Sequence, residues 1–157
     1  MSGSMRYDGQ YVNVKRMALA LEGLIRSEYP GDYLQLIEMF TFGRVTPPGK
    51  IVELMPKPVT IFDYQVRLRV PKGKLDRAPQ HFTNLHMGLQ LARRLLKRRA
   101  SENKQLFIIT DGQPTAHVEG ESVLLLYPPD PRSTAAILLP AARSHHRGPG
   151  RISAGLG

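Results

Sequence analysis

The sequence contains no cysteine among its 157 residues. That absence excludes a disulfide framework, a cysteine-ligated zinc site, an iron–sulfur cluster and a thiol nucleophile. It fits a reducing compartment, so we expect a cytoplasmic protein. Long hydrophobic runs are missing too, and none approaches the roughly 18 residues that a membrane-spanning helix needs. With 41% hydrophobic and 22% charged residues, the chain has the composition and length of one folded domain.

Acidic residues are scarce relative to basic ones. Thirteen Asp and Glu residues face 22 Lys and Arg residues, and 22 − 13 gives a net charge of +9. Five basic residues crowd into residues 93–99, and four arginines lie at positions 132, 143, 147 and 151. A surplus of this size favours an anionic partner such as nucleic acid. The first cluster, however, lies within a helical pattern, where a solvated helix face is the plainer interpretation.

Hydrophobic periodicity predicts a mixed order of helices and strands. Three- and four-residue spacing indicates helices over 13–27 and 83–100, the first with Asn13 as its N-cap. Strands are predicted at 33–42, 62–70 and 105–111, the last buried on both faces. A hairpin follows at 118–127, turning at Glu119 and Gly120, and a short helix at 131–139. This order predicts an α/β sandwich with a partly parallel sheet.

The sequence changes character after Pro140. Residues 141–157 have no hydrophobic period, few large apolar residues, and many arginines, histidines and glycines. We therefore predict a folded domain over 1–139 and a disordered basic tail over 140–157.

Oxygen-bearing side chains stand at three predicted junctions. Ser2 and Ser4 precede the first helix, Thr83 precedes the second long helix, and Asp111 ends the apolar strand before Gly112. Ligands of open α/β sheets bind outside the carboxyl ends of the strands, so these side chains could meet at one point. Hydroxyl and carboxylate oxygens are hard ligands that suit Mg²⁺. Ordinary alternatives are frayed terminal serines, an N-cap at Thr83 and a turn-forming Asp111.

These residues resemble the metal-ion-dependent adhesion site (MIDAS) of von Willebrand factor A (VWA) domains. The resemblance rests on Ser2-Gly3-Ser4-Met5, Thr83-Asn84-Leu85 and Ile109-Thr110-Asp111-Gly112, and it covers roughly residues 1–139. In this family the motif is Asp-x-Ser-x-Ser, then a distant Thr, then a distant Asp-Gly. The resemblance implies a Rossmann-like three-layer sandwich with Mg²⁺ held by Ser2, Ser4, Thr83 and Asp111.

Two departures from the family pattern stand out. The family's first Asp would fall just ahead of Met1, as would the central strand that delivers it. The family's last strands and helices are replaced by the Arg/Gly/His-rich tail. The expected fold is thus an incomplete VWA domain that lacks its first central strand. One hypothesis is a fragment with a start at an internal methionine and a shifted reading frame near Pro140. With only Asp111 to offset the cation, and the Met1 ammonium two residues from a ligand, we expect weak Mg²⁺ binding.

The resemblance implies a binding module in which a partner's carboxylate completes the metal coordination. Intracellular bacterial relatives often work beside MoxR-type AAA+ ATPases, so such an ATPase is the partner implied here. The alternatives are a basic nucleic-acid-binding fragment and a non-functional fragment of a larger VWA protein. We do not expect an enzyme, because no Gly-x-Ser-x-Gly elbow or phosphate-binding loop occurs. His81 and His86 are five residues apart, which does not fit a zinc pair on one helix face.

Overall fold

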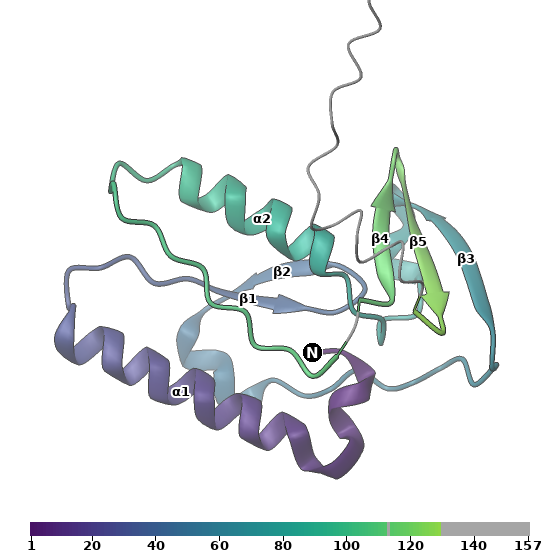
Figure 1. Cartoon of the computed structure of the whole chain (residues 1–157), viewed down its shortest axis with the longest axis horizontal. Coiled ribbons are helices and arrows are strands. Elements are labelled where there is room, and N and C mark those ends of the chain that lie inside the picture. Colours follow the sequence, from purple (N-terminus) through teal and green to yellow (C-terminus); the bar gives the residue numbers. More distant parts are fainter. Residues whose placement is uncertain (113, 130–157) are drawn as a thin grey trace, which may run out of the picture.

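A computed structural model describes residues 1–112 and 114–129. Two α-helices and five strands form the regular structure (Figure 1). They are α1 (Gln10–Glu28), β1 (Leu36–Met39), β2 (Gly43–Thr46), β3 (Val66–Pro71), α2 (Leu85–Lys97), β4 (Ala116–Glu119) and β5 (Ser122–Tyr127). Three 3₁₀ segments, η1 (Gly3–Gly9), η2 (Pro48–Glu53) and η3 (Lys72–Arg77), connect them. The helix predicted at 131–139 and the tail predicted at 140–157 lie outside the described residues.

The strands form two small sheets. β1 and β2 make an antiparallel hairpin, and β3, β5 and β4 make a second antiparallel sheet with β5 in the centre. In Figure 1 the β1–β2 hairpin lies between α1 and α2, and the second sheet stands beyond the start of α2. The chain is therefore α/β, as predicted. The parallel pairing that we expected is not found among the described strands, whose pairings are all antiparallel.

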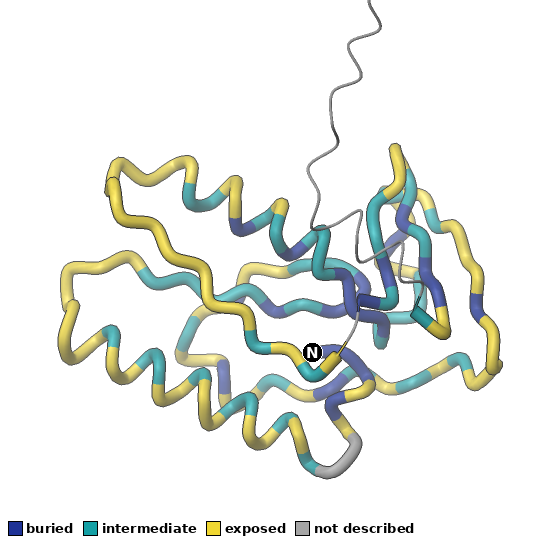
Figure 2. The backbone as a smooth tube through the Cα atoms, in the orientation of Figure 1, coloured by how far each residue is buried: buried dark blue, intermediate teal, exposed yellow. Residues whose placement is uncertain are grey.

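The main core lies against the three-stranded sheet. Its buried members come from β3, η3, the segment before α2, and β4–β5, and they are Val66, Leu75, Phe82, Ala116, Val123 and Leu125. α1 is different, because it has no buried residue (Figure 2). α2 approaches β1 closely at Gly88, where an added Cβ would clash with the Met39 side chain. Glycine thus permits this helix-to-strand contact.

The two long predicted helices, over 13–27 and 83–100, are confirmed with shifted ends. α1 begins at Gln10, and its N-cap is Gly9 in the left-handed conformation, so Asn13 lies inside the helix instead of capping it. α2 begins at Leu85, and its N-cap is Asn84. None of the helices in the described ranges has the length and apolar character needed to cross a membrane.

The segment predicted as a buried strand at 105–111 is not one. It runs extended but pairs with no described strand, and Leu106, Phe107 and Ile108 are exposed (Figure 2). The prediction of a buried strand here is wrong because an apolar run forms a strand only where a neighbouring strand pairs with it. Here β1 pairs with β2, and no described strand pairs with residues 105–111.

Candidate metal site

Ser2 and Ser4 lie together at the start of the chain. Their hydroxyl oxygens are 3.3 Å apart, and Ser2 is buried whereas Ser4 is exposed. The backbone between them is fixed, because the Gly3 amide donates to the His81 carbonyl at 2.9 Å. A Cβ at Gly3 would meet the His81 side chain, so the close approach requires glycine here. The segment before α2 thus holds the backbone at Gly3, between the two serines.

Thr83 is not the helix cap. The side chain of Asn84 accepts the Met87 amide at 3.0 Å and donates to the Thr41 carbonyl at 3.0 Å, so Asn84 carries out the capping. Thr83 instead pairs through its backbone, donating to the Thr115 hydroxyl and accepting the amides of Thr115 and Ala116. The Thr83 hydroxyl is thus free of the capping role that was the ordinary alternative.

Asp111 lies at the end of the extended segment. One of its carboxylate oxygens, Oδ1, is buried and has no hydrogen-bond partner among the described residues. The local turn is made by its neighbour, since the Thr110 hydroxyl accepts the Gly112 amide at 3.5 Å. Asp111 is therefore not needed as the turn former. A buried carboxylate oxygen without a partner is costly unless something else pairs with it.

A groove of about 240 Å³ brings some of these residues together. Ser2, Thr83 and Thr110 all line it, and Thr110 adjoins Asp111. Ser4 does not line the groove, but its hydroxyl oxygen is 3.3 Å from that of Ser2. Ser2 and Thr83 thus line the same groove as Thr110, whereas Asp111 itself does not line it.

Glu38 is the charged residue that sequence reasoning missed. It is buried on β1, and three cations surround its carboxylate: the Met1 ammonium at 2.7 Å, Arg44 at 2.6 Å and Lys57 at 3.3 Å. Burial raises the pKa of Glu38, but the hydrogen bond and charge of the Met1 ammonium, with Arg44 and Lys57, outweigh it and lower the pKa overall. An acid inside the apolar run 33–42 was the signal for a buried ion-pair cluster.

The same cluster changes the charge at the candidate site. The Met1 ammonium, which we expected to repel a cation, is neutralised by Glu38. Arg44 and Lys57 bring further positive charge to the same carboxylate, so the group as a whole is cationic. Hydroxyl oxygens and the half-buried Asp111 carboxylate fit a hard divalent cation, but this surrounding charge opposes it.

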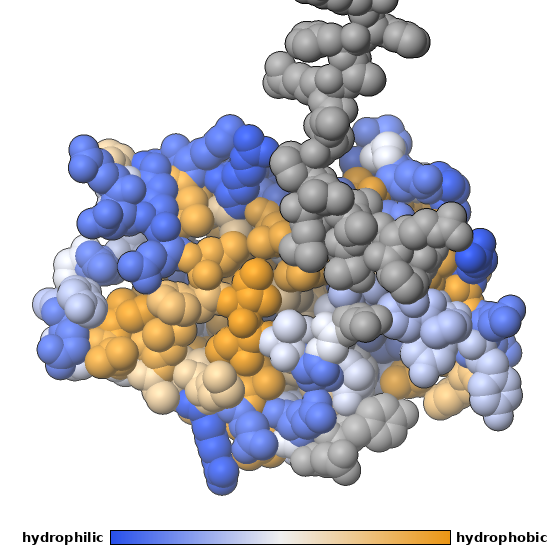
Figure 3. All heavy atoms as spheres, viewed as in Figure 1, coloured by the Kyte–Doolittle hydropathy of each residue, from blue (hydrophilic) through white to orange (hydrophobic). Residues whose placement is uncertain are grey.

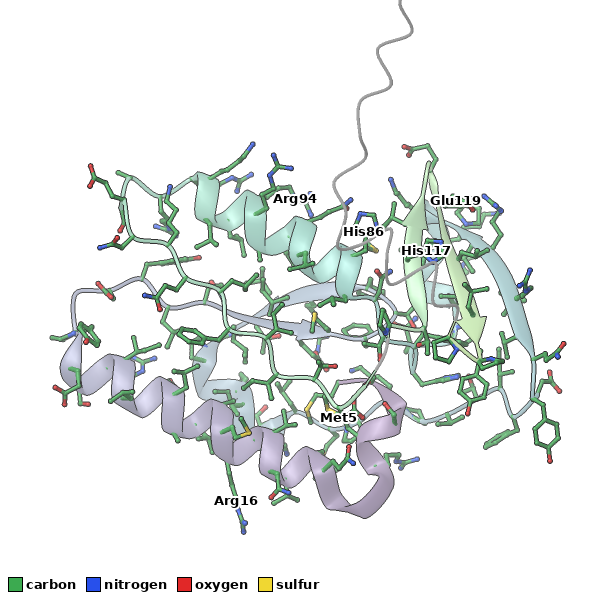
Figure 4. All side chains as sticks on the ribbon, viewed as in Figure 1. Met5, Arg16, His86, Arg94, His117 and Glu119 are labelled. Atoms are coloured by element: carbon green, nitrogen blue, oxygen red, sulfur yellow. The ribbon has the colours of Figure 1, made fainter. Side chains whose placement is uncertain are left out.

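His86 is engaged away from the candidate site. His86 on α2 accepts the Val118 amide through Nδ1 at 3.3 Å, and it lies next to His117 of β4 (Figure 4). Burial, and then the charges of His117 and Lys72, lower the pKa of His86. Over the described ranges there is no group of three or more His, Cys, Asp or Glu residues that could hold a metal ion.

Comparison with known proteins identifies the class. The family described as "Rv0959-like protein, vWA domain" matches residues 1–149. Three curated relatives are each 32% identical over 139 residues, covering 85% of this chain: Uncharacterized protein Mb0984 of Mycobacterium bovis, and Uncharacterized proteins MT0986 and Rv0959 of two Mycobacterium tuberculosis strains. No solved structure matches.

The α/β fold and the family match together define a von Willebrand factor A domain. The chain belongs to the Rv0959-like vWA family. Membership supports a protein-interaction or metal-dependent module in general terms. The matched region spans only 18% of the length of the mycobacterial relatives.

Proposed function

We propose that this chain is a metal-ion-dependent protein-binding module. Ser2, Ser4, Thr83 and Asp111 would hold Mg²⁺, and a carboxylate of a partner protein would complete its coordination. When bound, the metal would supply a positive charge to which an acidic side chain of the partner binds. The chain's own residues position the oxygens: His81 fixes the serine loop, Thr115 fixes Thr83, and Thr110 shapes the turn beside Asp111.

The buried oxygen of Asp111 is the observation that carries this proposal. The Oδ1 atom of Asp111, which adjoins the groove-lining Thr110, is buried and has no hydrogen-bond partner among the described residues, and such an oxygen would be stabilised by a cation or a donor. Its neighbours in the motif are hydroxyls, which are neutral, so the site has one formal negative charge. Together with the cationic cluster at Glu38, this supports an Mg²⁺ affinity of about millimolar or weaker.

Titration calorimetry with MgCl₂ tests this site. We expect weak, saturable binding to the natural chain, and loss of that binding in Asp111→Asn, which keeps the shape and removes the charge. Asp76→Asn is the matched control, because Asp76 is an exposed acid on η3 away from the groove. Tight binding would contradict the weak-site proposal, and equal binding by both variants would contradict the ligand set.

The partner is proposed at the level of chemistry and of class. The ligand would offer a carboxylate, and a MoxR-type AAA+ ATPase is the partner class that the VWA resemblance implies. Co-purification of such an ATPase, compared in MgCl₂ and in EDTA, tests this step. We expect recovery only in MgCl₂ and only with Asp111 intact. Equal recovery of the ATPase in MgCl₂ and in EDTA, and with or without Asp111, would contradict a metal-mediated contact.

Three further proposals concern the chain's activity, its location and a second kind of ligand. A non-enzymatic role is proposed from the sequence, which has no paired nucleophile and base in a recognised motif. A cytoplasmic location is proposed from the lack of cysteine. Nucleic-acid binding is the second candidate, favoured by the exposed basic residues Arg93, Arg94, Lys97 and Arg98 on α2 and just after it.

A further inference from the structure

β4 is an edge strand, because among the described strands it pairs with β5 alone. Its backbone groups alternate between the two sides. Thr115 accepts the Leu126 amide at 2.8 Å on the β5 side, so the N–H groups of Ala116 and Val118 point to the other side. Unpaired N–H groups on an edge strand are a template for pairing with another strand. The state of this edge therefore depends on what those two amides bond to.

The start of α2 closes this edge in place of a strand (Figure 1). Ala116 donates its amide hydrogen to the Thr83 carbonyl at 3.0 Å, and Val118 donates to Nδ1 of His86 at 3.3 Å. The first acceptor is a backbone carbonyl, which does not titrate. The second is an imidazole nitrogen, which accepts a hydrogen bond only while it is unprotonated. The closure at Val118 is therefore sensitive to pH, whereas the closure at Ala116 is not.

The tautomer of His86 follows from this contact. A neutral imidazole has one nitrogen that accepts and one that donates. Since Nδ1 accepts the Val118 amide, Nε2 carries the proton and can donate it to the side-chain amide of Gln90, which lies 2.9 Å away. A second proton can bind only at Nδ1. Protonation would then place two N–H donors face to face, and the hydrogen bond from Val118 would be lost.

The charges that face His86 oppose this second proton. They are His117 of β4, which lies next to it in Figure 4, and Lys72 of η3. Two ion pairs belong to the hydrophilic end of the β4–β5 hairpin (Figure 3), and they are Lys72 with Glu121 at 3.6 Å and Arg69 with Glu119. Burial, followed by the charges of His117 and Lys72, lowers the pKa of His86. The fold therefore holds this imidazole in its neutral form.

We propose that His86 is a pH-sensitive latch on the β4 edge: the neutral imidazole closes the edge at Val118, and protonation opens it there while the bond from Ala116 to Thr83 holds. The sign follows from linkage, because the released imidazole takes up a proton more readily than the buried one. The latch is thus closed at neutral pH and opens in acid, below the ordinary histidine pKa of 6.5. This inference goes beyond the proposed Mg²⁺ site and does not depend on it, so it is tested in EDTA.

Amide hydrogen exchange followed by NMR tests the latch on the full chain. The protection factor of Val118 should fall by about tenfold between about pH 7 and about pH 5, because a difference of one in pKa between the closed and open forms changes their ratio tenfold. The Ala116 amide, on the same edge but bonded to a carbonyl, is the internal control and should change by less than about threefold. This range lies above the ordinary glutamate pKa of 4.5, so the stabilisation by Glu38 is largely complete throughout.

Two substitutions separate the titration of His86 from its hydrogen bond. His86→Asn can place an amide oxygen where Nδ1 lies, which accepts the Val118 amide without titrating, so we expect protection that does not change over this pH range. Lys72→Gln removes a charge that opposes protonation, so the fall in protection should begin at a higher pH. Nitrogen NMR shifts of the natural chain at neutral pH should show the His86 ring protonated at Nε2.

Three results would overturn the proposal. Equal loss of protection at Ala116 and Val118 would mean that the whole sheet opens in acid and that His86 is not a latch. A loss of Val118 protection that persists in His86→Asn would assign the titration to another group. Ring shifts typical of a proton on Nδ1 at neutral pH would mean that Val118 does not donate to this nitrogen.

Discussion

Glu38 shows how one residue can make the stability of this chain depend on pH. Its side chain is 1% exposed and contacts three cations. Because the pKa of Glu38 is lowered in the folded chain, its carboxyl group binds fewer protons at acidic pH in the folded chain than in the unfolded chain. Its contribution to stability is therefore complete above its ordinary pKa and is lost as the pH falls through the lowered value.

The substitution Glu38→Gln tests this linkage. At neutral pH we expect a loss of about 3 kcal/mol in the free energy of unfolding, because the Met1 ammonium is left buried without its counter-charge. Below the ordinary pKa of a glutamate, near 4.5, the difference between variant and natural chain should shrink. Urea unfolding curves at several values between about pH 3 and 7 measure both the loss at neutral pH and its decrease in acid.

Arg44→Ala is the matched control for this prediction. Arg44 contacts the same carboxylate, but its side chain is 55% exposed. We expect it to contribute only about 0.2–1 kcal/mol, because solvent screens exposed ion pairs. A loss as large as that of Glu38→Gln would contradict the assignment of the effect to the buried ammonium.

The site residues could be predicted from the sequence to different extents. Ser2, Thr83 and Asp111 were predicted from the motif, and two of them line the same groove. The cap at Asn84 was not predicted, because a threonine and an asparagine in succession are both good caps and only the fold decides between them. The cations around Glu38 come from residues far apart in sequence, so no local pattern could reveal them.

Among the elements, the β4–β5 hairpin is defined most fully by its local sequence. Glu119 pairs with Ser122, so Gly120 and Glu121 form the turn. Gly120 has φ +56°, in the left-handed region that side chains other than glycine rarely adopt. The hairpin was therefore predictable, but the turn predicted at Glu119 and Gly120 lies one residue later, because Glu119 still pairs with Ser122.

Gly120→Ala should destabilise the chain. We expect a loss of about 1–2 kcal/mol in the free energy of unfolding, because the added Cβ is strained at a positive φ. No neighbouring atom lies near the position of that Cβ, so crowding does not contribute. Urea unfolding measures the effect. Glu121→Ala, an exposed residue in the same turn, is the control, and an equal loss there would contradict the backbone explanation.

The strands were harder to predict than the helices. The alternation over 62–70 predicted a strand, but β3 covers only Val66–Pro71, where β5 offers partners. Phe62 and Tyr64 lie beyond that ladder and are exposed. The prediction of a strand at 105–111 was wrong for the same reason. A helix satisfies its own backbone, whereas a strand depends on a neighbour that the local sequence does not contain.

Charge is the property that belongs to the whole molecule. The net charge of +9 includes three arginines of the predicted tail 140–157, at positions 143, 147 and 151. Without them the charge would be 9 − 3 = +6, which is still strongly basic. Non-specific attraction to polyanions is therefore expected from the domain itself as well as from its end.

Replacement of Arg143, Arg147 and Arg151 by serine tests that division. Binding to a labelled DNA duplex should weaken steeply with salt, and the variant should show a shallower dependence, by up to about 3 in the slope of log K against log salt. Anisotropy across a salt series measures both chains. A steep dependence on base sequence would contradict non-specific binding.

Thr83 and Asn84 have one consequence for how the molecule responds to stress. Asn84 is bonded to the turn that follows β1, through Phe40 and Thr41, while Thr83 is bonded to the residues that open β4. Two adjacent residues thereby connect sheets that share no ladder. Loss of either sheet would remove hydrogen bonds from this shared pair of residues, so we expect the two sheets to unfold together in one cooperative step.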